Sequence, residues 1–133
     1  MRVTTKDELN RLSEAVIGAA IAVHRELGPG LLESAYEACL EFELTSRGMV
    51  VERQKALPVV YRGMKVDCGF RIDLLVNDAL LVEVKAIDRF DRVHEAQVQT
   101  YLRLMGLNLG LLMNFNVIRL VDGVKRIVRD FPD

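Results

Sequence analysis

A chain of 133 residues has room for one domain with a full hydrophobic core. Half of the residues are hydrophobic and 28% are charged, which excludes an intrinsically disordered chain. The formal net charge of −1 gives no overall electrostatic attraction to nucleic acid. We therefore expect residues 1–133 to form a single globular domain.

The N-terminal stretch and the cysteines indicate where the protein works. The first residues do not lead into the hydrophobic region of a signal peptide. The early apolar run at residues 15–23 is too short to span a bilayer and predicts a buried helix. Cys39 and Cys68 have no metal-ligand spacing, which favours a reduced, cytosolic setting. We expect a cytoplasmic protein without membrane contact.

The first half of the chain predicts two helices and a strand. Apolar residues recur at helical spacings over residues 6–27 and predict a helix. Residues 28–30, Gly-Pro-Gly, end this helix, because glycine permits a left-handed cap and proline blocks continuation. A second helix is predicted over about 31–47. Valine-rich residues 50–61 predict a strand, and residues 62–64 predict a turn.

The second half alternates further strands with one helix. Strands are predicted over residues 65–76, 80–86, 109–114, 117–121 and 124–128. A helix is predicted over about 93–105. Asp122-Gly123 is typical of a hairpin turn. The order predicts an α/β fold in which helices flank a central mixed β-sheet, with a C-terminal β-hairpin.

Two neighbouring strands contain charged residues within apolar stretches: Asp73 in one, Glu83 and Lys85 in the next. The apolar faces of the two strands match if residues 77–79 form the loop between them, and Asp73 then lies directly opposite Glu83. A two-residue turn would place the acids on opposite faces. Burial of apolar side chains and clustering of the acids therefore favour the same register.

Clustered carboxylates repel and raise each other's pKa unless a cation lies between them. One interpretation of the pair is a buried salt bridge in which Lys85 neutralises one acid. A single lysine cannot neutralise two acids, so we favour a divalent-metal site at Asp73 and Glu83.

The charge distribution bears on the substrate. Residues 47–71 contain six basic and two acidic residues, whereas residues 1–46 contain four basic and eight acidic residues. A basic patch beside an acidic site would suit a phosphate-bearing substrate. The alternative is that these are ordinary solvated strand charges. Arg71 shares the strand face of Asp73 and is expected either to contact phosphate or to pair with an acid.

Asp73 and the sequence Glu83-Val84-Lys85 resemble the first acid and the E-x-K element of the PD-(D/E)XK nuclease superfamily. Ile72 stands where the superfamily often has proline. Residues 30–36 match G-x-x-E-x-x-Y, which resembles the signature of the GxxExxY family within this superfamily.

Gln97 and Tyr101 resemble the Q-x-x-x-Y element of exonuclease-type members. The matches extend over residues 24–115. The resemblance implies a restriction-endonuclease-like three-layer core with Mg²⁺ or Mn²⁺ at the central strands.

The resemblance also implies roles for individual residues. Asp73 and Glu83 would be metal ligands, and Lys85 would orient or deprotonate the attacking water or stabilise charge on the phosphate. Glu33 would be the helix-borne acid that reaches the metal directly or through water. Gln97 and Tyr101 would flank the site from the third helix.

Alternative interpretations exist for three residues on the helices, Glu33, Tyr36 and Tyr101. A negative charge near the start of a helix favours the helix dipole, which is an alternative role for Glu33. Tyr36 shares a helix face with Glu33 and is expected to be a packed wall residue beside nucleic acid rather than a chemical one. Tyr101 either flanks the nucleic acid or belongs to the core.

The sequence therefore predicts a metal-dependent nuclease that hydrolyses phosphodiester bonds in nucleic acid, DNA ahead of RNA. One alternative is a catalytically silent nucleic-acid-binding or regulatory module on the same fold. Another is a structural homodimer that uses residues 117–128 at its interface.

Overall fold

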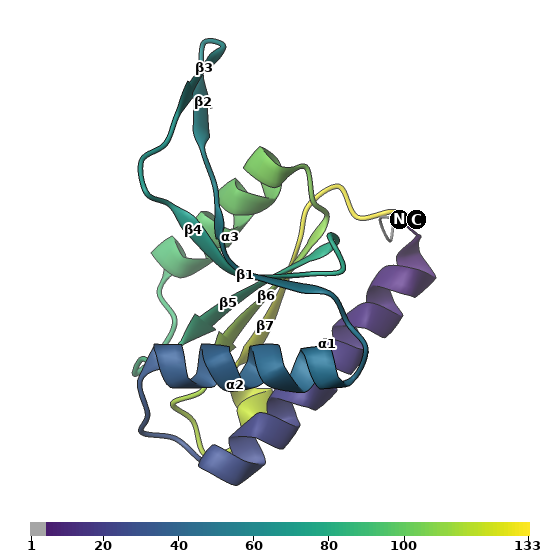
Figure 1. The fold of residues 1–133 in the computed structure, drawn as a ribbon, viewed down its shortest axis with the longest axis vertical. Helices are drawn as coiled ribbons and strands as arrows, with labels where there is room; N and C mark the ends of the chain where they lie inside the picture. Colours follow the sequence, from purple (N-terminus) through teal and green to yellow (C-terminus); the bar gives the residue numbers. More distant parts are fainter. Residues whose placement is uncertain (1–4) are drawn as a thin grey trace.

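The computed structural model describes residues 5–133; residues 1–4, where the N-terminal stretch considered above begins, lie outside the described part (Figure 1). The helices are α1 (Lys6–Leu27), α2 (Glu33–Ser46), α3 (Arg92–Met105) and the short 3₁₀ helix η1 (Leu120–Gly123). The strands are β1 (Val51–Ala56), β2 (Val59–Tyr61), β3 (Met64–Val66), β4 (Arg71–Val76), β5 (Leu80–Lys85), β6 (Leu109–Asn114) and β7 (Val124–Val128).

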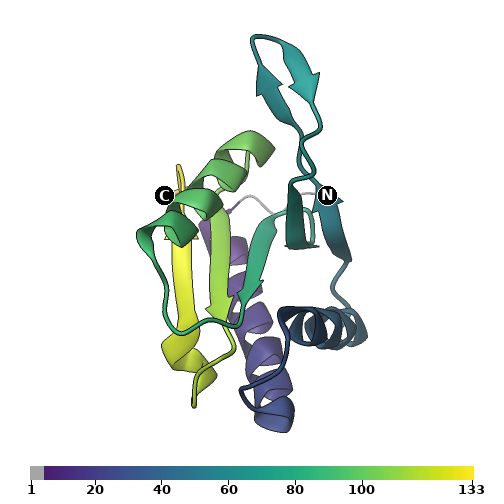
Figure 2. The same ribbon diagram turned by 90° about the vertical axis from the view of Figure 1, so that its left-hand side faces the viewer.

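Five strands form one mixed sheet in the order β1-β4-β5-β6-β7. Only the β5–β6 pair is parallel among these neighbours, and α3 forms the crossover that a parallel pair requires. Helices α1 and α2 cover one face of the sheet and α3 covers the other (Figures 1 and 2). Their side chains form a separate core on each face. The predicted α/β fold with helices on both sides of a mixed sheet is confirmed.

Helix α1 has the predicted limits. The Thr5 side chain accepts a hydrogen bond from the Glu8 N–H (3.2 Å), which satisfies one free donor of the first turn. Gly28 ends the helix with φ of 67°, in the left-handed region that favours glycine. Among residues 5–133, this helix and the others are too short or too polar to cross a membrane.

The predicted strands 50–61 and 65–76 are each two separate strands. Pro58, which has no N–H to donate, lies between β1 and β2. Strands β2 and β3 form a separate two-stranded sheet that projects beyond the main sheet (Figure 1). The Leu57 N–H donates to the Phe70 carbonyl (3.0 Å) at the base of this projection. We call residues 57–70 the β-arm.

The predicted C-terminal hairpin is wrong in its first strand. Residues 117–121 form no strand, and β7 pairs antiparallel with β6 instead. Close packing explains why position 123 is a glycine, because a Cβ atom there would overlap the backbone carbonyl oxygen of Asn114. The Asp-Gly pair therefore belongs to the η1 turn that leads from β6 into β7.

Candidate active site

The β4–β5 hairpin has the predicted register. Val76 pairs with Leu80 across a loop of residues 77–79, and Leu74 pairs with Val82. Continued by one position, this register sets Asp73 opposite Glu83, as the sequence predicts.

The face on which the acids lie follows from their neighbours along the strands. Leu81 belongs to the core beneath α3, and alternation along β5 puts Glu83 on that face. In β4, Ile72 and Leu75 on either side of Asp73 belong to the same core, and the charge of Asp73 affects the pKa of Tyr101 on α3. Lys85 follows on this face at the end of β5.

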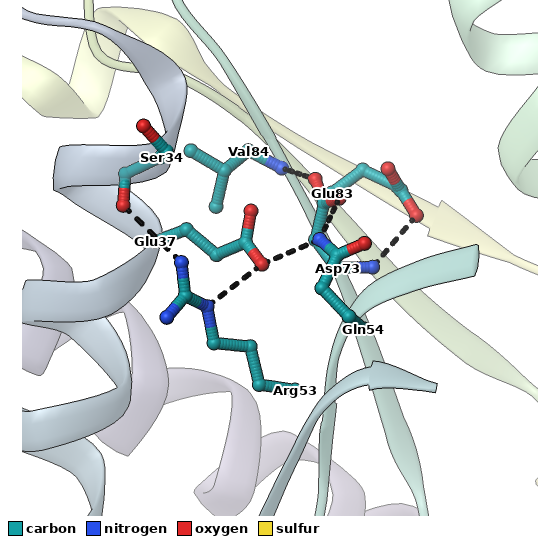
Figure 3. Close-up of polar contacts among 7 residues, drawn as sticks. All are labelled: Ser34, Glu37, Arg53, Gln54, Asp73, Glu83 and Val84. Atoms are coloured by element: carbon teal, nitrogen blue, oxygen red, sulfur yellow. Dashed lines mark hydrogen bonds and ion pairs between the residues drawn. The ribbon is translucent and has the colours of Figure 1, made fainter. Parts of the chain in front are cut away.

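Beyond the Leu74–Val82 pair, hydrogen bonds from the backbone to the side chains of Asp73 and Glu83 take the place of backbone–backbone hydrogen bonds between β4 and β5. The Val84 N–H donates to Asp73 Oδ2 (2.8 Å), and the Asp73 N–H lies 3.4 Å from Glu83 Oε1 (Figure 3). Each carboxylate is thus held by the backbone of the opposite strand. The strands separate at the position where their acids meet.

Regular sheet pairing is also interrupted on the other side of Asp73. The β1–β4 register omits the pair of Gln54 and Asp73, and Gln54 has φ of 55° in the left-handed region. Ile72 packs in the core beneath α3, although strict alternation groups it with Leu74 on the opposite face. The expected alternation along β4 is therefore wrong at Ile72, because the strand is distorted at Asp73.

The distortion brings Gln54 between an acid of α2 and the acid of β4. Gln54 Nε2 donates to Glu37 Oε1 (2.6 Å) and lies 3.3 Å from Asp73 Oδ1 (Figure 3). Arg53 Nε also contacts Glu37 Oε1 (3.0 Å), and Arg53 reaches the Ser34 carbonyl (3.4 Å). Glu37 is 5% exposed. This network fixes one oxygen of Asp73 relative to α2.

The sequence interpretation did not include Glu37 or Gln54 in the site. The available signal for Glu37 was its position one helical turn after Glu33, on the same helix face. No pattern indicated Gln54, because its role depends on a backbone conformation that strand-forming residues rarely adopt.

Glu83 is the most deeply buried acid of the site, at 4% exposure. Burial raises the pKa of its carboxyl to about 9, and the negative charge of Asp73 adds to this effect. The Lys85 ammonium acts in the opposite direction. Without a cation, Glu83 is therefore protonated at neutral pH.

Gln97 and Tyr101 border the acids from α3. Gln97 Nε2 donates to Tyr101 Oη (2.9 Å). Burial raises the pKa of Tyr101, and the charges of Glu83 and Asp73 raise it further. The structure therefore brings the α3 pair together with the acids on one face of the sheet.

Tyr36 lies on the opposite face of the sheet, with α2, and Glu33 is the first residue of that helix. Glu33 Oε2 accepts a hydrogen bond from the Ala86 N–H (2.9 Å), just beyond Lys85. Tyr36 is fully buried, stacks on Phe115 with 4.6 Å between ring centroids, and donates from Oη to the Gly28 carbonyl (2.6 Å). The structure thus places Tyr36 in the core, where a nucleic-acid strand would not reach its ring.

Most cations of the basic segment 47–71 pair with acids. These ion pairs are Arg47–Glu43, Arg53–Glu37, Lys55–Glu52 and Arg71–Asp67. Arg71 nevertheless stays exposed, with its Nη1 atom 3.6 Å from Asp67. Arg62 and Lys65 are on the β-arm without an acidic partner among residues 5–133, and Arg62 lies over the Tyr61 ring (5.4 Å to the centroid).

The acidic pair fits a hard divalent cation. Asp73 and Glu83 offer oxygen ligands, and Mg²⁺ commonly binds one or two carboxylates while keeping several waters. A buried carboxyl with a raised pKa beside a second acid is a group that a cation would return to its charged form. Within residues 5–133, no group of three or more His, Cys, Asp or Glu side chains is arranged to hold a metal ion.

A mixed sheet between two helical layers, with an Asp and a Glu-x-Lys on adjacent strands that separate there, defines a restriction-endonuclease-like α/β domain. The family model described as PD-(D/E)XK nuclease superfamily matches residues 10–127, so the chain belongs to that superfamily. Neither the comparison with curated proteins nor the comparison with solved structures found a match.

Proposed function

We propose that this protein is a divalent-metal-dependent nuclease that hydrolyses phosphodiester bonds, with DNA as the first substrate to test and RNA as the second. The main support is the pair of Asp73 and Glu83, in which a buried carboxyl contacts a second acid beside Lys85. Membership of the nuclease superfamily supports the class of reaction. The G-x-x-E-x-x-Y match at residues 30–36 supports assignment to the GxxExxY family.

Asp73 and Glu83 would hold Mg²⁺ or Mn²⁺, which supplies Lewis-acid chemistry and a more acidic bound water. Glu83 would bind as the carboxylate, so its proton leaves when the site is loaded. Lys85 would orient the attacking water or offset charge that develops on the phosphate.

We propose supporting roles for two further residues. Glu33 would act as an outer acid through water, because one of its oxygens is already engaged by the Ala86 N–H. Gln97 would position groups at the site from α3.

The test compares hydrolysis of DNA and RNA by wild type, Asp73→Ala and Lys85→Ala, each with Mg²⁺ or Mn²⁺. We expect each variant to lose at least about 100-fold in rate, because each removes a group that acts on the transition state. Lys125→Ala is the matched control, since Lys125 is exposed and pairs with Glu95 on the surface (3.0 Å). Unchanged activity in both site variants would refute the assigned roles.

A catalytically silent nucleic-acid-binding module is the second candidate. It is favoured because, within residues 5–133, no group of three or more His, Cys, Asp or Glu side chains is arranged to hold a metal ion. Binding to nucleic acid that needs no metal and produces no cleavage would support it. The predicted homodimer also stays a proposal: β7 is an edge strand, and light scattering at several concentrations tests association through it.

A further inference from the structure

A groove of about 450 Å³ lies between the base of the β-arm and α3. Val59 and Phe70 form its β-arm side, and Val93, Ala96 and Tyr101 are on its α3 side. Its lining is mainly apolar, and two of its side chains are well exposed: Phe70 at 43% and Val93 at 65%. Exposed apolar side chains gathered around one groove indicate a binding surface.

Two residues of α3 link the groove to the candidate active site, Tyr101 and Gln97. Tyr101 lines the groove and is close enough to Glu83 and Asp73 for their charges to affect it. Gln97 also lines the groove and donates to Tyr101. A molecule in the groove would therefore lie beside the acids, on the face of the sheet to which they belong.

The shape and chemistry of the groove fit a flat aromatic group. The Phe70 and Tyr101 rings are tilted by 59° with their centroids 6.4 Å apart, and the exposed part of the Phe70 ring is available for stacking. Nucleobases stack on aromatic side chains only when they are not already stacked and paired within a duplex.

Two arginines are direct sequence neighbours of residues that line the groove. Arg71 follows Phe70 directly, Arg92 precedes Val93 directly, and both arginines are exposed. Arg62 and Lys65 add two further cations on the β-arm. Cations around an apolar groove are the combination that binds single strands, because they contact phosphates while bases stack.

We propose that this groove binds an unpaired nucleobase of the strand whose backbone lies at Asp73 and Glu83. The substrate is therefore a single-stranded or frayed segment rather than a closed duplex. This inference rests on the proposed nuclease function, whose acids it uses to orient the strand.

The test measures binding of fluorescent oligonucleotides to the full chain in EDTA, so that no cleavage occurs. Single strands of DNA and RNA are compared with a closed duplex that has GC-rich blunt ends and no unpaired bases. We expect the single strand to bind at least about tenfold more tightly, in line with a stacking contribution of about 1–3 kcal/mol per base. The better of the two single strands identifies the sugar that the site prefers.

Two substitutions examine the groove itself. Ala96→Trp fills the groove from α3 and should weaken single-strand binding about tenfold, whereas Gln99→Trp, an exposed position of α3 outside the lining, should not. Phe70→Ala should weaken binding similarly, and Phe70→Tyr should restore it because the ring is retained. A 2-aminopurine base in the strand should lose fluorescence on binding wild type and Phe70→Tyr, but not Phe70→Ala.

The outcomes separate this inference from the proposed function. Equal affinity for single strand and closed duplex, or wild-type binding by Ala96→Trp, would overturn the inference even if the protein cuts nucleic acid. Groove-dependent binding of single strands without hydrolysis under any metal would refute the nuclease function and support the groove. Concentration-dependent dimers that Ala96→Trp disrupts would assign the groove to a second copy of the chain instead.

Discussion

Glu83 is a carboxyl whose charge depends on what lies beside it. It is buried next to Asp73, and both effects favour its protonated form. In the unfolded chain, the Glu83 carboxyl is exposed to water and has its ordinary pKa of 4.5. Proton uptake by this one residue therefore couples the stability of the metal-free protein to pH.

In EDTA, we expect the free energy of unfolding to fall as the pH rises from 4.5, the ordinary pKa of this group, to about 9, its pKa in the folded protein. Over this window the folded state keeps a proton that the unfolded state releases. The stabilisation that Glu83 contributes to the folded state is complete below this pH window and is lost at its upper end. Within the window, the free energy of unfolding falls by up to about 1.4 kcal/mol per pH unit.

Urea unfolding of wild type and Glu83→Gln at several pH values measures this contribution. The variant should lack the part of the slope that belongs to Glu83, because glutamine does not titrate. Parallel pH profiles for the two proteins would contradict the burial effect. Titrating groups that do not interact with Glu83 are common to both proteins and cancel in the comparison.

The sequence predicted the acidic pair because the hairpin register depends only on the apolar alternation and the length of the loop. It did not predict the bridge from Glu37 through Gln54 to Asp73. That bridge joins α2, β1 and β4 and needs a left-handed residue within a strand. Local patterns contain no information about such a contact, because it arises only when the three elements have packed together.

At the scale of elements, the site depends on how closely α3 approaches the sheet. Gly110 of β6 lies under this helix, and a Cβ atom there would be 2.9 Å from Val98 Cγ1. Val98 is fully buried, so it has little space to move away. The absence of a side chain at Gly110 therefore sets the distance between α3 and β6.

Gly110→Ala should destabilise the protein by about 1–3 kcal/mol, because the added methyl group overpacks the core between α3 and β6. It should also lower activity, since α3 positions Gln97 and Tyr101 at the acids. Urea unfolding and the nuclease assay measure the two effects.

Gly18→Ala on α1 is the matched control for this substitution. Apart from the backbone of α1 itself, the nearest atom to the new Cβ atom would be Arg47 Nη1 at 3.7 Å, which is an ordinary contact. Within a helix, alanine in place of glycine should stabilise by about 0.5–1 kcal/mol. If both alanine variants gained stability, the packing argument for Gly110 would be wrong.

The helices were more predictable than the strands. The apolar spacing and the caps of α1 specify its limits within its own sequence. The valine-rich segment 50–61 predicts extended structure equally well for β1 and for β2, which belong to different sheets. Residues 117–121 likewise look extended, but β7 finds its partner in β6. Strand pairing depends on distant residues, and alternation alone does not identify the partner.

At the scale of the whole molecule, the β-arm extends the β1–β4 pair beyond the body of the domain (Figure 2). Its outer residues Val60, Tyr61 and Met64 are 57%, 60% and 61% exposed. They add little to the core. We therefore expect the outer part of the β-arm to serve binding rather than stability.

Replacing residues 60–65 with Asn-Gly tests this expectation. Val59 and Val66 are paired across the arm, so a two-residue turn of this type can join them and leave the groove wall in place. The melting temperature should change by only a few degrees, since the core is unaffected.

Nucleic-acid binding by the shortened protein should be weaker and less dependent on salt. The replacement removes Arg62 and Lys65, and each lost phosphate contact should reduce the slope of log affinity against log salt by about 0.7 for a single strand. Titrations at several salt concentrations measure the slope. A shortened protein that no longer unfolds cooperatively would show that the β-arm is part of the stable fold.

The loop at residues 77–79 has a consequence for comparing related chains. Asp73 lies before this loop, and Glu83 and Lys85 lie after it, so the loop alone relates the two halves of the site. One inserted or deleted residue there would exchange the faces of β5 and turn both residues away from Asp73. Such a homologue would retain every motif residue and still lack the site, so its loop length predicts inactivity that a motif search would miss.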